Sequence, residues 1–131
     1  MLKVLVVEDS QARIDQFIQR LSEIGSPVYH IAKTSKEALQ FLASNKYDLI
    51  FLDHDLDYLP DEDRDDNAMP IARYLRDNPV NCHIIVHSLN DPGSENLLNT
   101  IGGAALRVQY VWEHDVFHRT IKINVECVGE C

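Results

Sequence analysis

Short runs of apolar residues, rich in β-branched side chains, recur along the chain. Five of them lie at residues 3–7, 28–32, 49–52, 83–86 and 106–111. Most of these runs lack the alternation of apolar and polar residues that is typical of a sheet with one face in water. We therefore predict five strands that are buried on both faces, as in a parallel sheet covered by helices on each side.

The segments between these runs have the apolar spacing of amphipathic helices. Ser10 and Thr34 are suitable N-caps for the first two helices, and Glu37 stands in capping-box spacing after Thr34. Two further helices are expected from about 67 to 76 and from about 91 to 102. The alternation of strands and helices predicts a doubly wound α/β fold, whose ligands bind at the carboxyl ends of the strands.

Residues 116–127 fit two structures. Phe117, Ile121 and Val125 have the spacing of a helix, whereas Ile121, Ile123 and Val125 alternate as residues of a strand do. We favour a short helix with a tail that frays from about residue 126.

The composition, with 45% hydrophobic and 25% charged residues, is that of one ordinary globular domain, which we place at residues 1–131. The net charge of −9 is unevenly distributed, because eight acidic residues and one basic residue lie between Asp53 and Asp66. Such a surface repels phosphates, so direct binding to a nucleic-acid duplex is not expected. The run from Asp61 to Asp66 is interpreted as a solvated loop, with a lid or a partner surface as the alternative.

Three cysteines, Cys82, Cys127 and Cys131, lack paired spacing, which fits reduced thiols better than disulfides or a zinc site. The first apolar run is too short for a signal peptide, and no apolar stretch is long enough to span a membrane. These features predict a soluble, cytoplasmic protein without a membrane partner.

Polar side chains suited to chemistry follow the predicted strands directly. In chain order they are Glu8 and Asp9, then Asp53, His54 and Asp55, then His87, Ser88 and Asn90, and finally Glu113 and His114. Neighbouring carboxylates raise each other's pKa unless a cation lies among them, and Mg²⁺ or Mn²⁺ prefers such oxygen ligands. We therefore expect a metal site at this edge of the sheet. The motifs of EF-hand, P-loop and dinucleotide-binding sites are absent from the sequence.

Three of these strand ends make the chain resemble the receiver domain of two-component response regulators over nearly its whole length. The matching segments are 4–9 with its acidic pair, 49–53 with its final aspartate, and 84–88 with its final serine. The resemblance implies a flavodoxin-like (βα)5 fold with a five-stranded parallel sheet in the strand order 2-1-3-4-5.

The resemblance also implies roles for individual residues. Glu8 and Asp9 would hold Mg²⁺, and Asp53 would be both the phosphoacceptor and a further metal ligand. Asp55 would offer its backbone carbonyl to the metal, and Ser88 would bind the phosphoryl group. The implied partner is a kinase or another signalling protein of a phosphorelay.

Two features depart from conventional receivers. The lysine that normally follows the fifth strand is replaced by Glu113, and His114 stands where a proline is usual. In addition, the sequences LDHDLD at 52–57 and VHSLNDPG at 86–93 resemble the divergent cyclic-phosphate-processing receiver family. This resemblance implies a phosphorylated small molecule as the partner.

The favoured hypothesis is Mg²⁺-assisted processing of a cyclic phosphate, such as a cyclic nucleotide. Opening the ring needs a neutralised phosphate, an activated nucleophile and a proton for the leaving oxygen, and His54 and His87 could act as base and acid beside Asp53. The phosphate-binding candidates are Ser88, Asn90, Glu113 and His114. The alternative function is that of a stand-alone, atypical response regulator receiver, phosphorylated on Asp53 or acting as a pseudo-receiver through protein contacts.

The site residues have structural alternatives too. Strict alternation would turn His54 and His87 away from the pocket, into packing roles. Ser88 and Asn90 could cap the following helix, and Glu113 could simply open the last one.

Overall fold

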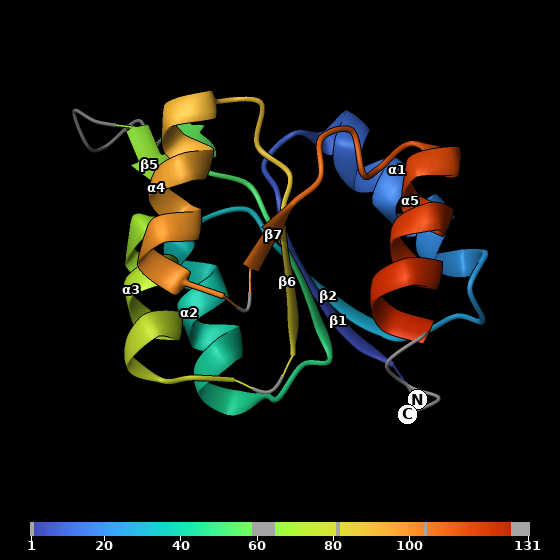
Figure 1. Ribbon diagram of the computed structural model, residues 1–131, viewed down its shortest axis with the longest axis horizontal. Helices are drawn as coiled ribbons and strands as arrows, with labels where there is room; N and C mark the ends of the chain where they lie inside the picture. The colour runs from blue at the N-terminus through green and yellow to red at the C-terminus, as the bar shows by residue number, and fades with distance from the viewer. Residues whose placement is uncertain (1, 59–64, 81, 104, 127–131) are drawn as a thin grey trace.

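A five-stranded parallel sheet forms the central layer of the structure (Figure 1). The computed structural model describes residues 2–58, 65–80, 82–103 and 105–126. The strands lie in the order β2-β1-β3-β6-β7, and their bounds are Val28–Ala32, Lys3–Val7, Leu49–Leu52, His83–Val86 and Ala105–Arg107. The predicted doubly wound, flavodoxin-like α/β fold is confirmed.

Helices cover both faces of the sheet, as its strands, apolar on both faces, require. On one face lie α1 (Gln11–Ser22) and α5 (His114–Thr120), and on the other lie α2 (Ser35–Ser44), α3 (Met69–Asp77) and α4 (Asp91–Ile101) (Figure 1). No helix in the described ranges is both long and apolar enough to cross a lipid bilayer.

Side-chain caps begin three of these helices. The hydroxyl of Ser10 accepts a hydrogen bond from the backbone N–H of Arg13 at 3.4 Å, and that of Thr34 accepts one at 3.1 Å from the N–H three residues further on. Asn90 caps α4 in the same way, with its amide oxygen 2.9 Å from the backbone nitrogen of Gly93. Each cap satisfies an N–H that has no partner within the helix. The N-caps predicted from the sequence are thus confirmed for the first two helices.

A two-stranded antiparallel ribbon of β4 (Asp55–Tyr58) and β5 (Asp65–Asn67) follows β3. It was not predicted, because aspartate and asparagine have low strand propensity. The end of the segment predicted as an acidic loop forms part of β5, while residues 61–64 of that segment lie outside the described residues. The strand numbering therefore differs from the predicted 2-1-3-4-5, since β4 and β5 fall between β3 and β6 along the chain.

The C-terminal part of the chain corrects one prediction and confirms another. The fifth strand ends at Arg107 and not at residue 111, because the backbone turns at Tyr110, whose φ is +58°. Trp112 is buried beyond this turn. The helix favoured for the last segment is present, since α5 continues as a π-helical segment, Ile121–Glu126. The tail beyond it lies outside the described residues.

Strand alternation decides which side chains meet at the carboxyl edge of the sheet. In β1, β3 and β6, the residues packed in the core with α1 and α5 include Val6, Phe51 and Ile85. Two positions further along the chain in each case come Glu8, Asp53 and His87, which alternation directs to the same side. The expectation that alternation turns His87 away from the acids is therefore wrong. Because the three strands are adjacent and parallel, these three side chains converge just past the strand ends.

Candidate functional site

A buried polar cluster lies at the carboxyl ends of β1, β3 and β6. Glu8, Asp53 and His87 each place one side-chain atom within 4.8 Å of the others. These residues are only 0%, 4% and 0% exposed, respectively. The two acids were expected to lie together, and the register of β6 adds His87 to them.

The chain's own donors hold the carboxylate of Glu8 in one orientation. Its Oε2 accepts hydrogen bonds from the backbone N–H groups of Asp9 at 2.9 Å and of Ser10 at 3.1 Å. Its Oε1 lies 3.0 Å from Nε2 of His87 and 3.6 Å from a guanidinium nitrogen of Arg13. These donors compensate the Glu8 carboxylate for the hydration that it loses on burial.

The acids next to Glu8 ionise less readily than usual. Burial raises the pKa of Asp53 to about 6. His87 acts to lower this pKa, and Glu8 acts to raise it further. Burial and a hydrogen bond with Glu8 also raise the pKa of Asp9. A cation would stabilise the ionised form of both groups, and their oxygen atoms fit a hard divalent ion such as Mg²⁺. Glu8, Asp9 and Asp53 could therefore hold a metal.

His87 is neutral in this environment. Burial lowers the pKa of its imidazole to about 4. The neutral ring donates its Nε2–H to Glu8, while Nδ1 finds no hydrogen-bond partner within the described part of the chain. Phe17 and Trp112 meet the ring edge to face, with centroids 5.1 Å and 5.9 Å away. His87 is thus both a core aromatic and a support for Glu8.

His54 belongs to a second cluster, against the start of α4. Its Nδ1 donates a hydrogen bond to Oδ1 of Asp55 at 2.7 Å, and the amide of Asn90 donates to the same oxygen at 3.1 Å. Burial would raise the pKa of Asp55, but these hydrogen bonds outweigh burial and lower it. A Cβ on Gly93 would lie 2.6 Å from the His54 ring, so glycine leaves the room that the ring needs. His54 and His87 therefore belong to different clusters.

Ser88 and Asn90 connect the two clusters. Ser88 is buried, its hydroxyl accepts a hydrogen bond from the backbone N–H of Asn90 at 3.1 Å, and its hydrogen bond with Asp53 acts to lower the pKa of that acid. Asn90 caps α4 through its oxygen and binds Asp55 through its nitrogen. Ser88 thus lies next to Asp53. Asn90 takes its alternative role of helix cap through its oxygen, and its nitrogen is engaged as well.

The structure does not bring His114 to the acidic cluster. Its ring lies 3.0 Å from Oδ1 of Asp115 and 4.0 Å from Oε1 of Glu23 at the end of α1. Glu113 is exposed at the start of α5 and does not cap that helix with its side chain. Both residues follow a turn and not a strand, because β7 ends earlier than predicted.

Arg13 is a site residue that the sequence analysis missed. Its guanidinium group lies 4.5 Å from the centre of the Trp112 ring and 3.6 Å from Glu8. Stacking on an aromatic face holds the planar cation in place. One sequence signal could have revealed it, since Arg13 falls in the first turn of the helix that begins directly after Glu8 and Asp9. A positive charge from α1 therefore lies near the acids.

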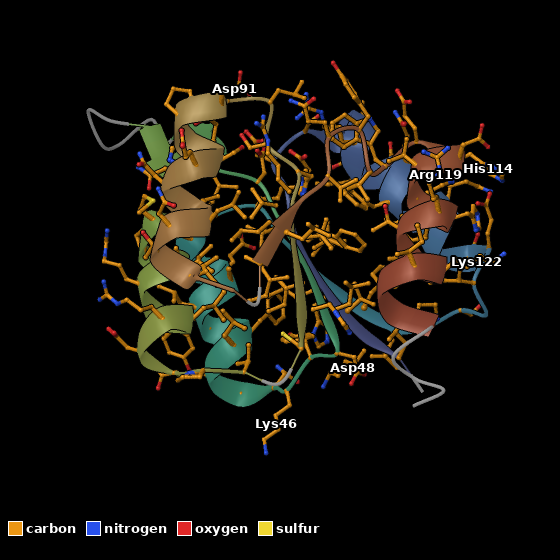
Figure 2. All side chains as sticks on the ribbon, in the orientation of Figure 1. Lys46, Asp48, Asp91, His114, Arg119 and Lys122 are labelled. Carbon is orange, nitrogen blue, oxygen red and sulfur yellow. The ribbon has the colours of Figure 1, made fainter. Side chains whose placement is uncertain are left out.

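A cavity of about 550 Å³ lies at the amino ends of the strands, opposite the acidic cluster. It is lined by residues that include Lys46, Asp48, Tyr74 and Cys82. In Figure 2, Lys46 and Asp48 mark this lower edge, and Asp91 marks the upper one, where the strands end. The cavity therefore has no contact with the acidic cluster.

Known proteins resemble the chain in sequence and in structure. Residues 4–103 match the model of a family described as the cyclic-phosphate processing receiver domain. No curated protein sequence gives a significant match. The structure is similar to that of a CheY-like response regulator receiver domain protein from Methanospirillum hungatei JF-1, with a TM-score of 0.77 and 18% identity over 99% of this chain and 98% of that one.

A second solved structure, a two-component response regulator from Clostridium difficile, gives a TM-score of 0.71 and 23% identity over 93% of each chain. These likenesses show a receiver fold. The family model matches most of the chain, including the strand ends that carry Glu8, Asp53 and His87. The chain therefore belongs to the cyclic-phosphate processing receiver family.

Proposed function

We propose that the carboxyl edge of the sheet opens the ring of a cyclic phosphate by hydrolysis, with His54 as the proton-transfer group. The hydrogen bond of 2.7 Å between His54 and Asp55 carries this proposal. A carboxylate on Nδ1 fixes the tautomer and the orientation of the ring, which leaves Nε2 to exchange a proton. His54 is also within reach of solvent, since its side chain is 14% exposed.

The reaction adds one water molecule across one P–O bond of the ring. The water oxygen bonds to phosphorus, the bond to one ester oxygen breaks, and that oxygen takes up a proton to become a hydroxyl group. Mg²⁺ held by Glu8, Asp9 and Asp53 would supply positive charge to the non-bridging phosphate oxygens. His54 would accept a proton from the attacking water and return it to the ester oxygen that leaves, and Ser88 would donate a hydrogen bond to the phosphate.

His87 was expected from the sequence to act as a general acid, and this proposal gives it a different role. It is fully buried and neutral, and its Nε2–H is engaged by Glu8. We therefore assign it the positioning of Glu8. Arg13, which is partly exposed above Trp112, adds a fixed positive charge near the acids.

His54→Gln is expected to lower the turnover of a cyclic phosphate by about a hundredfold or more, because glutamine cannot exchange a proton. Turnover of 2′,3′-cyclic and 3′,5′-cyclic nucleotides with Mg²⁺ would be followed by phosphorus NMR. His83→Gln, which changes a histidine at the start of β6, is the matched control. Equal rates in both variants, or no turnover of any cyclic phosphate by the unchanged protein, would refute the proposal.

A second candidate function is phosphorylation of Asp53 in a phosphorelay. It is favoured by the place of Asp53 at the end of β3, hydrogen-bonded with Ser88, in a chain that resembles response regulators. A kinase or another signalling protein would then be the partner.

Incubation with acetyl phosphate and Mg²⁺ is expected to add one phosphoryl group to the chain, seen by intact mass. The nucleophile is the carboxylate of Asp53, so the mass gain should vanish in Asp53→Asn. A chain that gains no mass, or a gain that survives in Asp53→Asn, would rule out this second function.

A further inference from the structure

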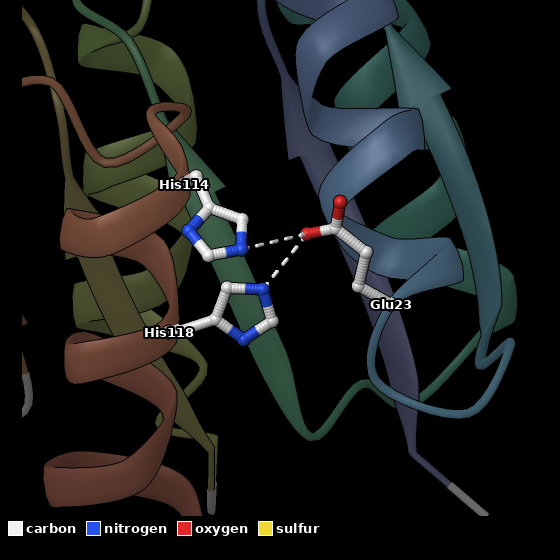
Figure 3. Close-up of side chains that lie close together, drawn as sticks. All are labelled: Glu23, His114 and His118. Carbon is white, nitrogen blue, oxygen red and sulfur yellow. Dashed lines mark hydrogen bonds and ion pairs between the residues drawn. The ribbon is translucent and has the colours of Figure 1, made fainter.

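Two histidines and a glutamate meet between α1 and α5, away from the acidic cluster (Figure 3). Glu23 follows α1 directly, and His114 and His118 lie one turn apart on α5. Oε1 of Glu23 lies 2.8 Å from Nε2 of His118 and 4.0 Å from Nε2 of His114. Figure 3 shows both rings directed at this one oxygen. The proposed chemistry at Asp53 makes no use of these residues.

We propose that Glu23, His114 and His118 bind a divalent transition-metal ion, with Zn²⁺ as the best fit, and that the ion ties α1 to α5. Imidazole nitrogen with one carboxylate oxygen is a ligand set that Zn²⁺ accepts and that Mg²⁺ does not favour. In a tetrahedral site with bonds of about 2.1 Å, ligand atoms lie about 3.4 Å apart. The two distances from Glu23 bracket that value, so small side-chain rotations would complete the geometry.

The carboxylate of Asp115, which binds the ring of His114, supports this assignment. Nδ1 of His114 donates a hydrogen bond to Oδ1 of Asp115 at 3.0 Å. This bond keeps the proton on Nδ1, so the lone pair on Nε2 faces Glu23, which is the usual arrangement of a metal-ligating histidine. The side chain of His114 is 61% exposed, so water can reach the remaining coordination position.

One neighbouring cation opposes metal binding. Nε of Arg20 lies 3.1 Å from the same Oε1 of Glu23 that both histidines approach. A metal ion must displace this guanidinium group or share the carboxylate with it. Arg20→Gln is therefore expected to tighten Zn²⁺ binding, which would not follow if the cluster were only a set of ion pairs.

The test is a Zn²⁺ titration of the full chain in saturating Mg²⁺, followed by nitrogen NMR of the histidine rings. The Nε2 signals of His114 and His118 are expected to shift together and to saturate at one ion per chain. Glu23→Gln should weaken Zn²⁺ binding by about tenfold or more, because it removes the charged ligand. Glu95→Gln, which removes the same charge from an exposed position on α4, should leave the affinity unchanged.

Zn²⁺ should also raise the thermal midpoint of the unchanged protein and not that of Glu23→Gln. The proposal is overturned if only one of the two ring signals shifts, if the signals do not saturate, or if Glu23→Gln and Glu95→Gln bind Zn²⁺ alike. Shifts confined to His54 or His87 would also overturn it, because the ion would then lie at the carboxyl ends of the strands and not between α1 and α5. None of these outcomes depends on turnover of a cyclic phosphate.

Discussion

His87→Ala is expected to lower the free energy of unfolding by about 3–5 kcal/mol, the largest stability loss that we predict for a single site. Two costs add. The imidazole packs between Phe17 and Trp112 without any exposure, so its removal leaves a cavity. It also donates a hydrogen bond to the buried carboxylate of Glu8, which then loses one of the donors that compensate its burial.

Urea denaturation of both proteins at neutral pH measures this loss. His83→Ala makes the same substitution at the first residue of β6, where the side chain is only partly buried. We expect this control to cost less than about 1 kcal/mol. Similar losses for His83→Ala and His87→Ala would contradict the structural role of His87. Because an unfolded variant has no turnover, a loss of turnover in His87→Ala is evidence of a catalytic role only under conditions in which the variant is folded.

Asp53→Asn is expected to have the opposite effect and to raise the free energy of unfolding by about 2–3 kcal/mol at neutral pH without divalent metal. Burial raises the pKa of Asp53 from 3.8 to about 6 in the folded protein. Below about pH 4 the group is protonated in both states and costs nothing. As the pH rises through about 6, the folded protein must carry a buried charge that the unfolded chain carries in water, so stability falls. Asparagine removes that penalty.

The measurement is urea denaturation in EDTA at about pH 7 and again at about pH 4, where most of the gain should disappear. Saturating Mg²⁺ should reduce the gain as well, because a cation stabilises the ionised form of Asp53. Asp15→Asn changes an exposed acid of α1 and should alter stability by less than about 0.5 kcal/mol. A destabilised Asp53→Asn, or a gain independent of pH, would show that burial does not disfavour this charge.

Much of the fold could be predicted from local pattern. The apolar runs at 3–7 and 49–52 are too short for helices and too uniformly apolar for an exposed sheet, so both faces had to be covered. Once parallel strands are expected, their carboxyl ends must share one edge. The meeting of Glu8 and Asp53 therefore follows from their positions directly after two such runs.

The ends of the fifth strand and the ribbon after β3 were less predictable. The apolar run at 106–111 continues past the last ladder hydrogen bonds, and nothing in its residue types marks the turn at Tyr110. Likewise, β4 and β5 pair through their backbones although their side chains are mostly acidic. Backbone pairing depends on a partner strand, which local periodicity does not reveal.

By itself, the sequence determined the doubly wound fold, the helix caps and the group of acids at the carboxyl edge, because local patterns mark each strand, each cap and the acid that directly follows each strand. Only the tertiary structure decided that His87 joins Glu8 while His54 joins Asp55, that Arg13 stacks on Trp112, and that Glu23 meets the histidines of α5. The contacts of His87, Arg13 and Glu23 depend on the register between strands and on the packing of helices distant in sequence, neither of which residue spacing encodes. The pair of His54 and Asp55 lies against Asn90 and Gly93 at the start of α4, another contact between segments distant in sequence.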